Sequence, residues 1–223
     1  MNKQFHQLAP LLALRQMPEK FQAFFISPTY TEQQLQTDAD LPDLVDKDNL
    51  VQDAEIHHAH SYKLQEVTDK QGNKHLDHLD GDCLQRLKGL AADVHDFHAE
   101  SKLDMLRYAL AKMTHYRIDC LTYPHLHRGQ PWSKHHEAFE TYMGKFLVVN
   151  QGTIGQLEFT VYEDVYRGAR EIALKAWYEG RDLVVKLEQG EDIPDDLALQ
   201  VCRTCVKGVG DLWLTLASEL KII

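Results

Sequence analysis

The chain has 223 residues, which is enough for one domain or at most two small ones. It carries 24 basic and 34 acidic residues, for a formal net charge of −10, and 43% of its residues are hydrophobic. These values exclude a disordered or collagen-like chain, and no run approaches the roughly eighteen apolar residues of a membrane span. The acidic balance argues against a broad nucleic-acid-binding surface, but it allows a small anionic substrate held by metal ions.

The start of the chain, MNKQFHQLAP, has no basic segment followed by a long apolar stretch. We therefore expect no secretory signal and a cytoplasmic location, although a mature secreted form has the same appearance. The four cysteines are too few and too scattered for a disulfide framework. The single Cys-x-x-Cys pair, Cys202 and Cys205, is expected to pack in the core of a helix.

Residues 4–25 carry apolar residues at helical spacing, and Pro10 and Pro18 are expected to break or restart this helix. Residues 27–56 are polar and rich in aspartate, which predicts a long loop of the kind that is usually functional. Residues 61–76 predict a short hairpin that turns at Gln-Gly-Asn. This hairpin is the one convincing strand signal in the sequence.

Helical patterns then return over residues 80–98, 100–119, 133–148, 157–188 and 195–221. Many helices with almost no strand predict a single all-α domain over residues 1–223, a helical bundle with at most one short β-hairpin. Bundles commonly hold metal sites between facing helices, so a multinuclear site in a cleft is compatible with this fold.

All thirteen histidines lie between His6 and His136, and residues 137–223 contain none. Histidine is the commonest metal ligand, so this uneven distribution suggests a metal site built from the first part of the chain. On composition alone, a chance cluster of solvated histidines explains the distribution equally well.

The segment from His115 to His125 carries the strongest pattern. A spacing of four puts His115 and Asp119 on one helix face, one turn apart. The chain then turns at a proline, which can bring His125 back towards the same site. His136 and Glu140 repeat the spacing of four, and such nitrogen and oxygen ligands without thiolate suit Zn²⁺ and other first-row metals.

The surroundings of His115 and Asp119 leave two interpretations open. Both residues point away from the leucine-rich stripe of their helix, and their face also holds Tyr108 and Ala111 but Lys112 as well. They lie either on a solvated face or on a second buried face of a central helix.

These residues resemble the signature of the zinc-dependent phospholipase C and single-strand-specific nuclease superfamily. Its members carry His-Tyr-x-x-Asp, a proline turn and a histidine, followed by His-x-x-x-Glu or His-x-x-x-Asp. The matching residues here are His115, Tyr116, Asp119, Pro124, His125, His136 and Glu140. The proline of this chain lies one position later than is usual in the family.

The resemblance extends upstream in order and rough spacing. His6 fits a family histidine close to the mature amino terminus, and Asp43, in a Leu-Pro-Asp context, fits a family aspartate. His57 or His58 fits the next histidine of the family, with His60 as a weaker candidate.

The resemblance implies an all-α fold with three zinc ions in a cleft. One ion would be held by Asp43, His57 or His58, His115 and Asp119, a second by His125, His136 and Glu140, and a third by His6 with Asp119 bridging to it. Secreted family members complete the third site with a mature amino-terminal tryptophan, but no tryptophan precedes Trp132 here. The free amine of Met1 would have to replace it.

The activity that the resemblance implies is hydrolysis of phosphoesters by metal-activated water, as in a phospholipase C-like phosphodiesterase. Asp43 is the candidate general base. The expected substrate is a small phosphoester or a phospholipid head group rather than a nucleic acid. Tyr123 and Trp132 flank the motif and either line a pocket or pack in the core.

Two rival interpretations stay open. The adjacent pair His95-Asp96 is typical of another all-α class of metal phosphohydrolases, in which His57 or His58 and Asp119 would complete the ligand set. Alternatively, the helical bundle binds metal without catalysing a reaction. Most of the remaining histidines are expected to face solvent, namely His75, His78, His98, His127 and His135.

Overall fold

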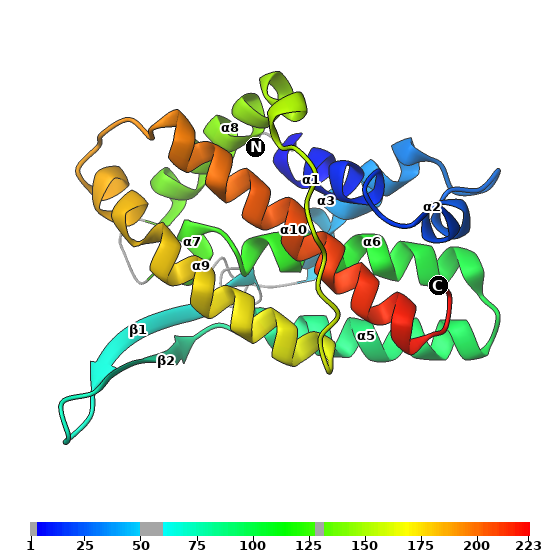
Figure 1. Cartoon of the computed structure of the whole chain (residues 1–223), viewed down its shortest axis with the longest axis horizontal. Coiled ribbons are helices and arrows are strands. Elements are labelled where there is room, and N and C mark those ends of the chain that lie inside the picture. The colour runs from blue at the N-terminus through cyan, green and yellow to red at the C-terminus, as the bar shows by residue number, and fades with distance from the viewer. Residues whose placement is uncertain (1–3, 50–59, 128–131) are drawn as a thin grey trace.

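Helices make up most of the described chain, and a two-stranded antiparallel hairpin projects from them (Figure 1). This computed structural model describes residues 4–49, 60–127 and 132–223. Within its helices, the side chains of residues 43–49, 132–135, 179, 182, 184 and 187 are outside the description. The predicted all-α class with one hairpin is confirmed over the described ranges.

The helices are α1 (Gln4–Leu14), α2 (Glu19–Phe25), α3 (Glu32–Asn49), α5 (Cys83–Ala99), α6 (Leu103–Asp119), α7 (Tyr123–Leu126), α8 (Trp132–Val149), α9 (Val165–Glu188) and α10 (Asp195–Glu219), with a short 3-10 helix, η1 (Gln151–Thr153). The hairpin pairs β1 (Lys63–Thr68) with β2 (Lys74–Asp80). Its turn places Gly72 at φ 87°, a left-handed conformation that glycine adopts without strain. The predicted hairpin and its turn are therefore confirmed.

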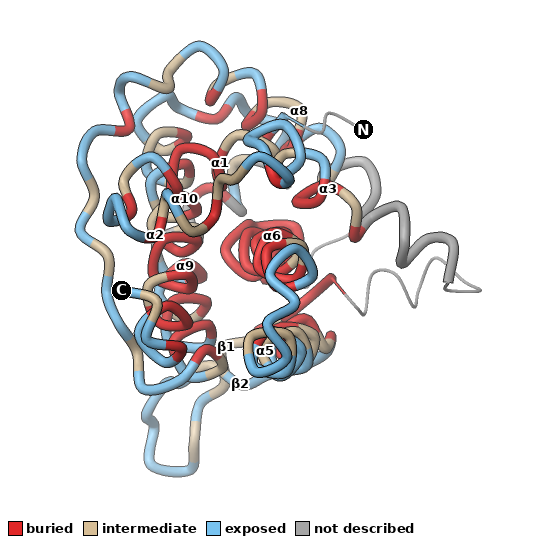
Figure 2. Tube along the Cα trace, turned by 90° about the vertical axis from the view of Figure 1, so that its right-hand side faces the viewer, coloured by how far each residue is buried: buried red, intermediate tan, exposed pale blue. Residues whose placement is uncertain are grey.

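Helix α6 lies at the centre of the molecule, where it packs against α3, α5 and α10. Figure 2 shows it buried along most of its length. Its buried residues include His115 and Asp119, each 1% exposed. Because neighbouring helices enclose α6 on several sides, the second of the two interpretations is correct, and these two residues lie on a buried face of a central helix.

The long loop predicted over residues 27–56 is wrong for residues 32–49, which form α3. The Thr31 hydroxyl accepts a hydrogen bond of 3.2 Å from the backbone N–H of Gln34, which caps the start of this helix. The buried residues Leu35 and Ala39 turn one face of α3 towards the core. Tertiary packing has thus outweighed the polar composition that favoured a loop.

The two prolines of residues 4–25 behave differently. Pro18 directly precedes α2, as a restart of the helix predicts. Pro10 lies inside α1, which continues from Gln4 to Leu14, so the break predicted there is wrong. Packing of α1 against α3, α8 and α10 supports the helix despite the hydrogen bond that proline cannot donate.

The helix predicted from residue 157 begins only at Val165, and residues 157–164 cross α10 in an extended conformation (Figure 1). Side chains of α10 accept hydrogen bonds from two backbone N–H groups of this segment. The backbone N–H of Thr160 donates to Asp211 Oδ1 over 2.7 Å, and that of Tyr162 donates to Thr215 Oγ1 over 3.1 Å. Periodicity alone does not reveal partners so distant in sequence.

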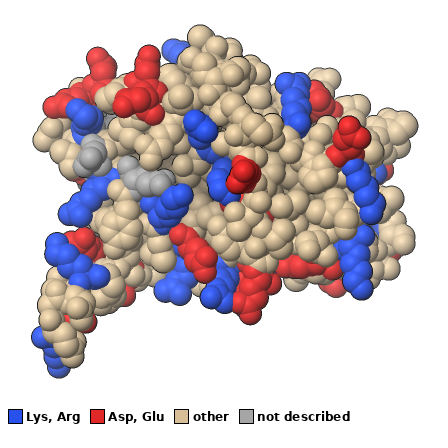
Figure 3. Space-filling model, in the orientation of Figure 1, with Lys and Arg blue, Asp and Glu red and all other residues tan. Residues whose placement is uncertain are grey.

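None of the helices in the described ranges is long and apolar enough to cross a membrane. Acidic and basic side chains are interspersed over the face shown in Figure 3. All four cysteines are buried with free thiols, which confirms the core position predicted for Cys202 and Cys205.

Candidate metal centre

Six of the predicted ligands converge beside the carboxy-terminal end of α6. They are His6 from α1, His115 and Asp119 from α6, His125 from α7, and His136 and Glu140 from α8. The side chain of His136 is 16% exposed, and the others are at most 5% exposed. Residues from both ends of the first 140 positions therefore meet, as the histidine distribution suggested.

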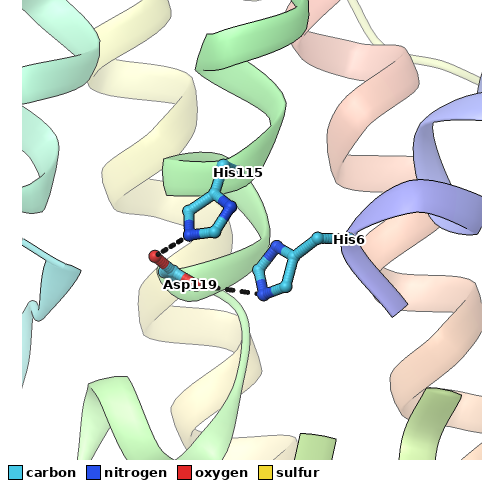
Figure 4. Close-up of side chains that lie close together, drawn as sticks. All are labelled: His6, His115 and Asp119. Atoms are coloured by element: carbon cyan, nitrogen blue, oxygen red, sulfur yellow. Dashed lines mark ion pairs between the residues drawn. The ribbon is translucent and has the colours of Figure 1, made fainter. Parts of the chain in front are cut away.

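The first group consists of His6, His115 and Asp119, whose ligand atoms all lie within 4.8 Å of one another. Figure 4 shows the two imidazoles approaching the carboxylate from different helices. Nε2 of His6 lies 3.5 Å from Oδ1 of Asp119, and Nε2 of His115 lies 3.5 Å from Oδ2. The two rings stack with their centroids 4.0 Å apart.

The second group consists of His125, His136 and Glu140. Nε2 of His136 lies 2.7 Å from Oε1 of Glu140 and 3.1 Å from Nε2 of His125. Two ligand atoms at ~2.0–2.1 Å from a tetrahedral zinc ion stand about 3.3 Å apart. The spacing of the nitrogen and oxygen atoms in this group is thus close to that of a metal coordination shell.

The two groups lie directly beside each other. Oδ1 of Asp119 lies 3.4 Å from Nε2 of His125, and Oε1 of Glu140 lies 3.3 Å from Nε2 of His6. Each carboxylate therefore faces histidines of both groups. A carboxylate in this position can bind one cation or bridge two.

Backbone carbonyls hold two of the histidines in the tautomer that carries its proton on Nδ1 and leaves Nε2 free to bind a metal. Nδ1–H of His115 donates to the carbonyl oxygen of Ala39 over 2.9 Å, and Nδ1–H of His125 donates to that of His60 over 2.8 Å. In the neutral rings, Nε2 is then left with its lone pair directed at the centre. Metal-binding histidines are commonly oriented by such an outer hydrogen bond.

The electrostatics favour charged carboxylates and a neutral His125. Burial alone would raise the pKa of Asp119, but His125, His115 and the hydrogen bond from His60 outweigh it and hold this pKa well below its usual range. The neighbouring imidazoles of His125, His136 and His6 similarly overcome the effect of burial and depress the pKa of Glu140. Burial lowers the pKa of His125 to about 4, so this ring is neutral near pH 7.

His60, the weaker candidate of the sequence, also lies at the centre. It is 3% exposed, and its Nδ1–H donates to Oδ2 of Asp119 over 2.8 Å. His57 and His58, which fitted the spacing better, lie outside the described residues, as does the side chain of Asp43. The signal that could have raised His60 was its place in a His-His-Ala-His run, where spacing cannot separate neighbours.

The residues of the rival His-Asp interpretation lie elsewhere. His95 and Asp96 are both exposed on α5, and Nε2 of His95 pairs with Glu219 Oε2 over 2.9 Å. Neither belongs to the two buried groups.

The remaining histidines only partly follow the prediction of solvent exposure. His75 and His78 are exposed, and His98 and His127 are half-buried. The side chain of His135 is outside the description.

The residues present fit a divalent cation. Oδ1 of Asp119 and Nδ1 of His6 are buried without a hydrogen-bond partner among the described residues. An unsatisfied buried carboxylate oxygen is unfavourable, and a cation removes the penalty. Imidazole nitrogens and carboxylate oxygens without thiolate are the ligand set of Zn²⁺ and other first-row metals. Buried histidine and carboxylate groups of this chain could therefore hold metal ions.

Comparisons of the chain with protein-family models, with curated proteins and with solved structures give no match. The resemblance to the zinc-dependent phospholipase C and nuclease superfamily therefore depends on the residues that carry it and on how they are arranged.

Proposed function

We propose that this chain is a zinc-dependent phosphoester hydrolase, a phosphodiesterase that resembles the phospholipase C and single-strand-specific nuclease superfamily. The observation that carries the proposal is the pair of adjoining buried groups, His6, His115 and Asp119 beside His125, His136 and Glu140. Two neighbouring sites of this composition are typical of enzymes that hydrolyse phosphate esters with more than one divalent ion.

Zinc held by these residues would supply charge neutralisation for the phosphoryl oxygens and would activate a water molecule near neutral pH. The chain's own residues set the charge of the site. Two divalent ions bring four positive charges, and the ionised carboxylates of Asp119 and Glu140 offset two of them. The remaining positive charge would attract an anionic phosphodiester into a site with little exposure to solvent.

The outer shell of the site supplies positioning. The carbonyls of Ala39 and His60 fix the rings of His115 and His125, and the side chain of His60 holds one oxygen of Asp119. Fixed ligands need little reorganisation during the reaction, which is the main electrostatic advantage of a folded active site.

Geometry favours a different assignment of His6 from the one that the resemblance implies. The resemblance gives His6 to a third ion and His115 to the first, but these two rings stack and face the same carboxylate. We assign both to one site, and no third ion enters the proposal. The substrate proposed is a small phosphoester or a phospholipid head group, because the net charge of −10 repels a long polyanion.

The test combines elemental analysis of the purified chain with turnover of bis-p-nitrophenyl phosphate. We expect about two zinc ions per chain, and turnover that a chelator abolishes and added zinc restores. His95→Ala serves as the matched control, since it removes an exposed histidine with a carboxylate partner, and it should leave both metal content and turnover unchanged.

Three results contradict the proposal in different ways. A metal content near zero in protein never exposed to chelator excludes the metal centre itself. Full metal loading with strongly metal-dependent stability, but without turnover of any phosphoester, instead identifies a non-catalytic metal-binding protein. If Asp96→Asn causes severe loss of metal, the rival His-Asp interpretation is correct.

A further inference from the structure

Two of the buried cysteines meet between α5 and α6. Cys83 is the first residue of α5, Cys120 directly follows α6, and both are 0% exposed. Their Sγ atoms lie 2.9 Å apart, although the two residues are 37 positions apart in the sequence. Unbonded carbon atoms in proteins approach one another to ~3.5–4.0 Å, and sulfur is the larger atom. The two sulfurs are therefore closer than an ordinary packing contact allows.

A hydrogen bond does not account for this approach. The Sγ–H of Cys83 donates to the carbonyl oxygen of Tyr116 over 3.1 Å, which leaves the Sγ–H of Cys120 to donate to Sγ of Cys83. Thiols are weak donors and weak acceptors. An attraction of this strength does not draw two sulfur atoms inside their contact distance.

A shared metal ion does not account for it either. Two thiolates at ~2.3 Å from a tetrahedral zinc ion stand about 3.8 Å apart. Neither Cys83 nor Cys120 belongs to a group of possible metal ligands among the described residues. A disulfide, with its S–S bond of ~2.05 Å, requires the sulfurs to approach by less than about 1 Å from their present separation.

The pair lies beside the candidate metal centre. The backbone N–H of Cys83 donates to the carbonyl oxygen of Ser61 over 3.1 Å, and Ser61 follows His60. Cys120 follows Asp119, the carboxylate to which His60 donates a hydrogen bond. A bond between the two sulfurs would therefore link the start of α5, which holds the segment of His60, to the end of α6, which carries Asp119.

Burial decides when such a bond can form. The thiolate is the species that reacts with an oxidant, and a thiol buried away from water neither ionises readily nor meets an oxidant. Both thiols are accessible in the unfolded chain. Once the core has closed around a disulfide, the same burial protects the bond from an external reductant.

We propose that Cys83 and Cys120 form a disulfide while the chain folds in the presence of an oxidant, and that the folded core then protects this bond. The bond closes a loop of 37 residues, so it restricts the unfolded chain and stabilises the fold. Neither zinc nor a phosphoester takes part, so this inference and the proposed hydrolase can fail independently.

The oxidant is a small disulfide of the glutathione class. One protein thiolate attacks it, which forms a mixed disulfide and releases one small thiolate. The second protein thiolate then attacks the protein sulfur of the mixed disulfide and releases the other small thiolate. The two protein thiols lose two electrons and two protons, and the small disulfide takes them up to become two thiols.

The first test maps the disulfide. The reduced full chain is unfolded in urea, refolded in a mixture of oxidised and reduced glutathione, alkylated and digested with trypsin. Its four cysteines lie in four different tryptic peptides. We expect residues 75–86 joined to residues 118–128, and the number of free thiols should fall from four to two. The same mapping of chain exported to the bacterial periplasm requires no refolding.

Two cysteine variants provide the matched comparison, since Cys83 and Cys202 are both 0% exposed. Cys202→Ala, which starts with three thiols, should still lose two of them on oxidative refolding. Cys83→Ala also starts with three thiols and should keep all of them. The peptide map of the unmodified chain decides the pairing even if a variant folds poorly.

The second test measures protection and stability. Reduced glutathione should cleave the bond at least tenfold more slowly in the folded chain than in urea, because attack requires the core to open. The oxidised chain should unfold at a urea concentration about 1–2 M higher than the reduced chain.

The absence of the peptide pair from both the refolded and the exported chain overturns the proposal. A bond between Cys202 and Cys205, or loss of two thiols in Cys83→Ala, assigns the oxidation to other cysteines and overturns it as well. A lower urea midpoint for the oxidised chain would show that the fold does not accommodate the bond. Equal rates of reduction in the folded chain and in urea overturn the protection by the core.

Discussion

Histidine–carboxylate pairs occur in two contrasting regions of this molecule. On the outer side, His95 of α5 lies 2.9 Å from Glu219, with the two side chains 46% and 28% exposed. At the centre, His136 lies 2.7 Å from Glu140, with side chains 16% and 5% exposed. The separations are nearly equal, so the distance between an imidazole and a carboxylate does not by itself identify a metal site.

The regions differ in burial and in the number of neighbours. Water solvates the outer pair, and such surface pairs contribute little to stability. At the centre, ligand atoms from α1, α6, α7 and α8 lie within a few ångströms of one another with little access to water. A candidate metal centre is therefore recognised by several buried ligand atoms that lie close together. A single histidine–carboxylate pair does not distinguish it from the protein surface.

The largest effect should come from neutralising Asp119, the carboxylate at the middle of the candidate metal centre. Asp119→Asn should lower turnover of bis-p-nitrophenyl phosphate by on the order of 10³-fold. It should also reduce the metal content, because Asp119 faces His6, His115 and His125. Steady-state kinetics and elemental analysis of the same preparation measure the two effects together.

Asp96→Asn is the control for this prediction, since it makes the same chemical change at an exposed position of α5. It should behave like the unmodified chain. If Asp119→Asn keeps its full metal content and turnover, Asp119 belongs to an ordinary buried hydrogen-bond network.

Removal of metal should destabilise the fold through the central region alone. A ligand at 100 to 1,000 times its dissociation constant stabilises the folded state by about 3–4 kcal/mol. We expect a chelator to lower the free energy of unfolding by about this amount in urea titrations, both in the unmodified chain and in His95→Ala. Equal unfolding curves with and without chelator would show that no cation contributes to the folded state.

His60→Ala should lower the affinity of the chain for zinc, with a smaller effect than the loss of a direct ligand. The loss of a side chain that orients a ligand typically weakens metal binding by about 10–100-fold without changing the number of ions. A titration with zinc, read by a competing chromophoric chelator, measures affinity and stoichiometry together. If the variant instead loses one ion per chain, His60 is a direct ligand.

Lys63, which lies between the hairpin and α7, should make a smaller contribution to the free energy of unfolding, and this contribution should depend on pH. Its Nζ donates to the carbonyl oxygen of Pro124, and burial lowers its pKa to about 7, against a partial opposing effect of Asp80. Between about pH 7 and 10.5, the unfolded chain keeps a proton that the folded chain releases, so stability rises with pH in this window.

The rise attributable to Lys63 should be on the order of 2 kcal/mol, since partial exposure reduces the effect of burial. Urea titrations at several pH values, compared with those of Lys63→Met, isolate it. The variant should lack this rise. Identical pH profiles would show that the ammonium group is well solvated in the folded state.

The smallest effect is expected on the outer side. His95→Ala should change the free energy of unfolding by less than about 0.5 kcal/mol, because its pair with Glu219 is exposed. Urea titration is the measurement. A loss several times larger would mean that surface pairs in this chain carry real stability, which would weaken the contrast between the two regions.

Much of the fold could be predicted because its helices carry a regular apolar pattern. The hairpin turn and the helices that contain His115 and Glu140 follow from local sequence alone. The errors arose where distant residues decide the structure. Polar α3 is helical because its Leu35 face packs inside, and residues 157–164 are extended because Asp211 and Thr215 satisfy their backbone.

The candidate centre divides in the same way. Pairs such as His115 and Asp119, four positions apart on one helix, can be predicted from helical geometry. The contribution of His60 could not, because it depends on how His60 lies against α6 and α7, which are distant from it in the sequence. The stacking of His6 on His115 likewise depends on the packing of α1, which no local pattern specifies.

The hydrogen bonds to Ala39 and His60 are accepted by main-chain oxygens. The orientation of the two imidazoles that donate them therefore depends on the number of residues in the chain more than on the side chains at these two positions. Substitution at Ala39 preserves the carbonyl, whereas deletion of one residue upstream in α3 turns it by about 100°. The imidazole of His115 would then be free to rotate, although every ligand is still encoded. Mutational scans that only exchange side chains would overlook this dependence, and natural insertions in α3 should be rare.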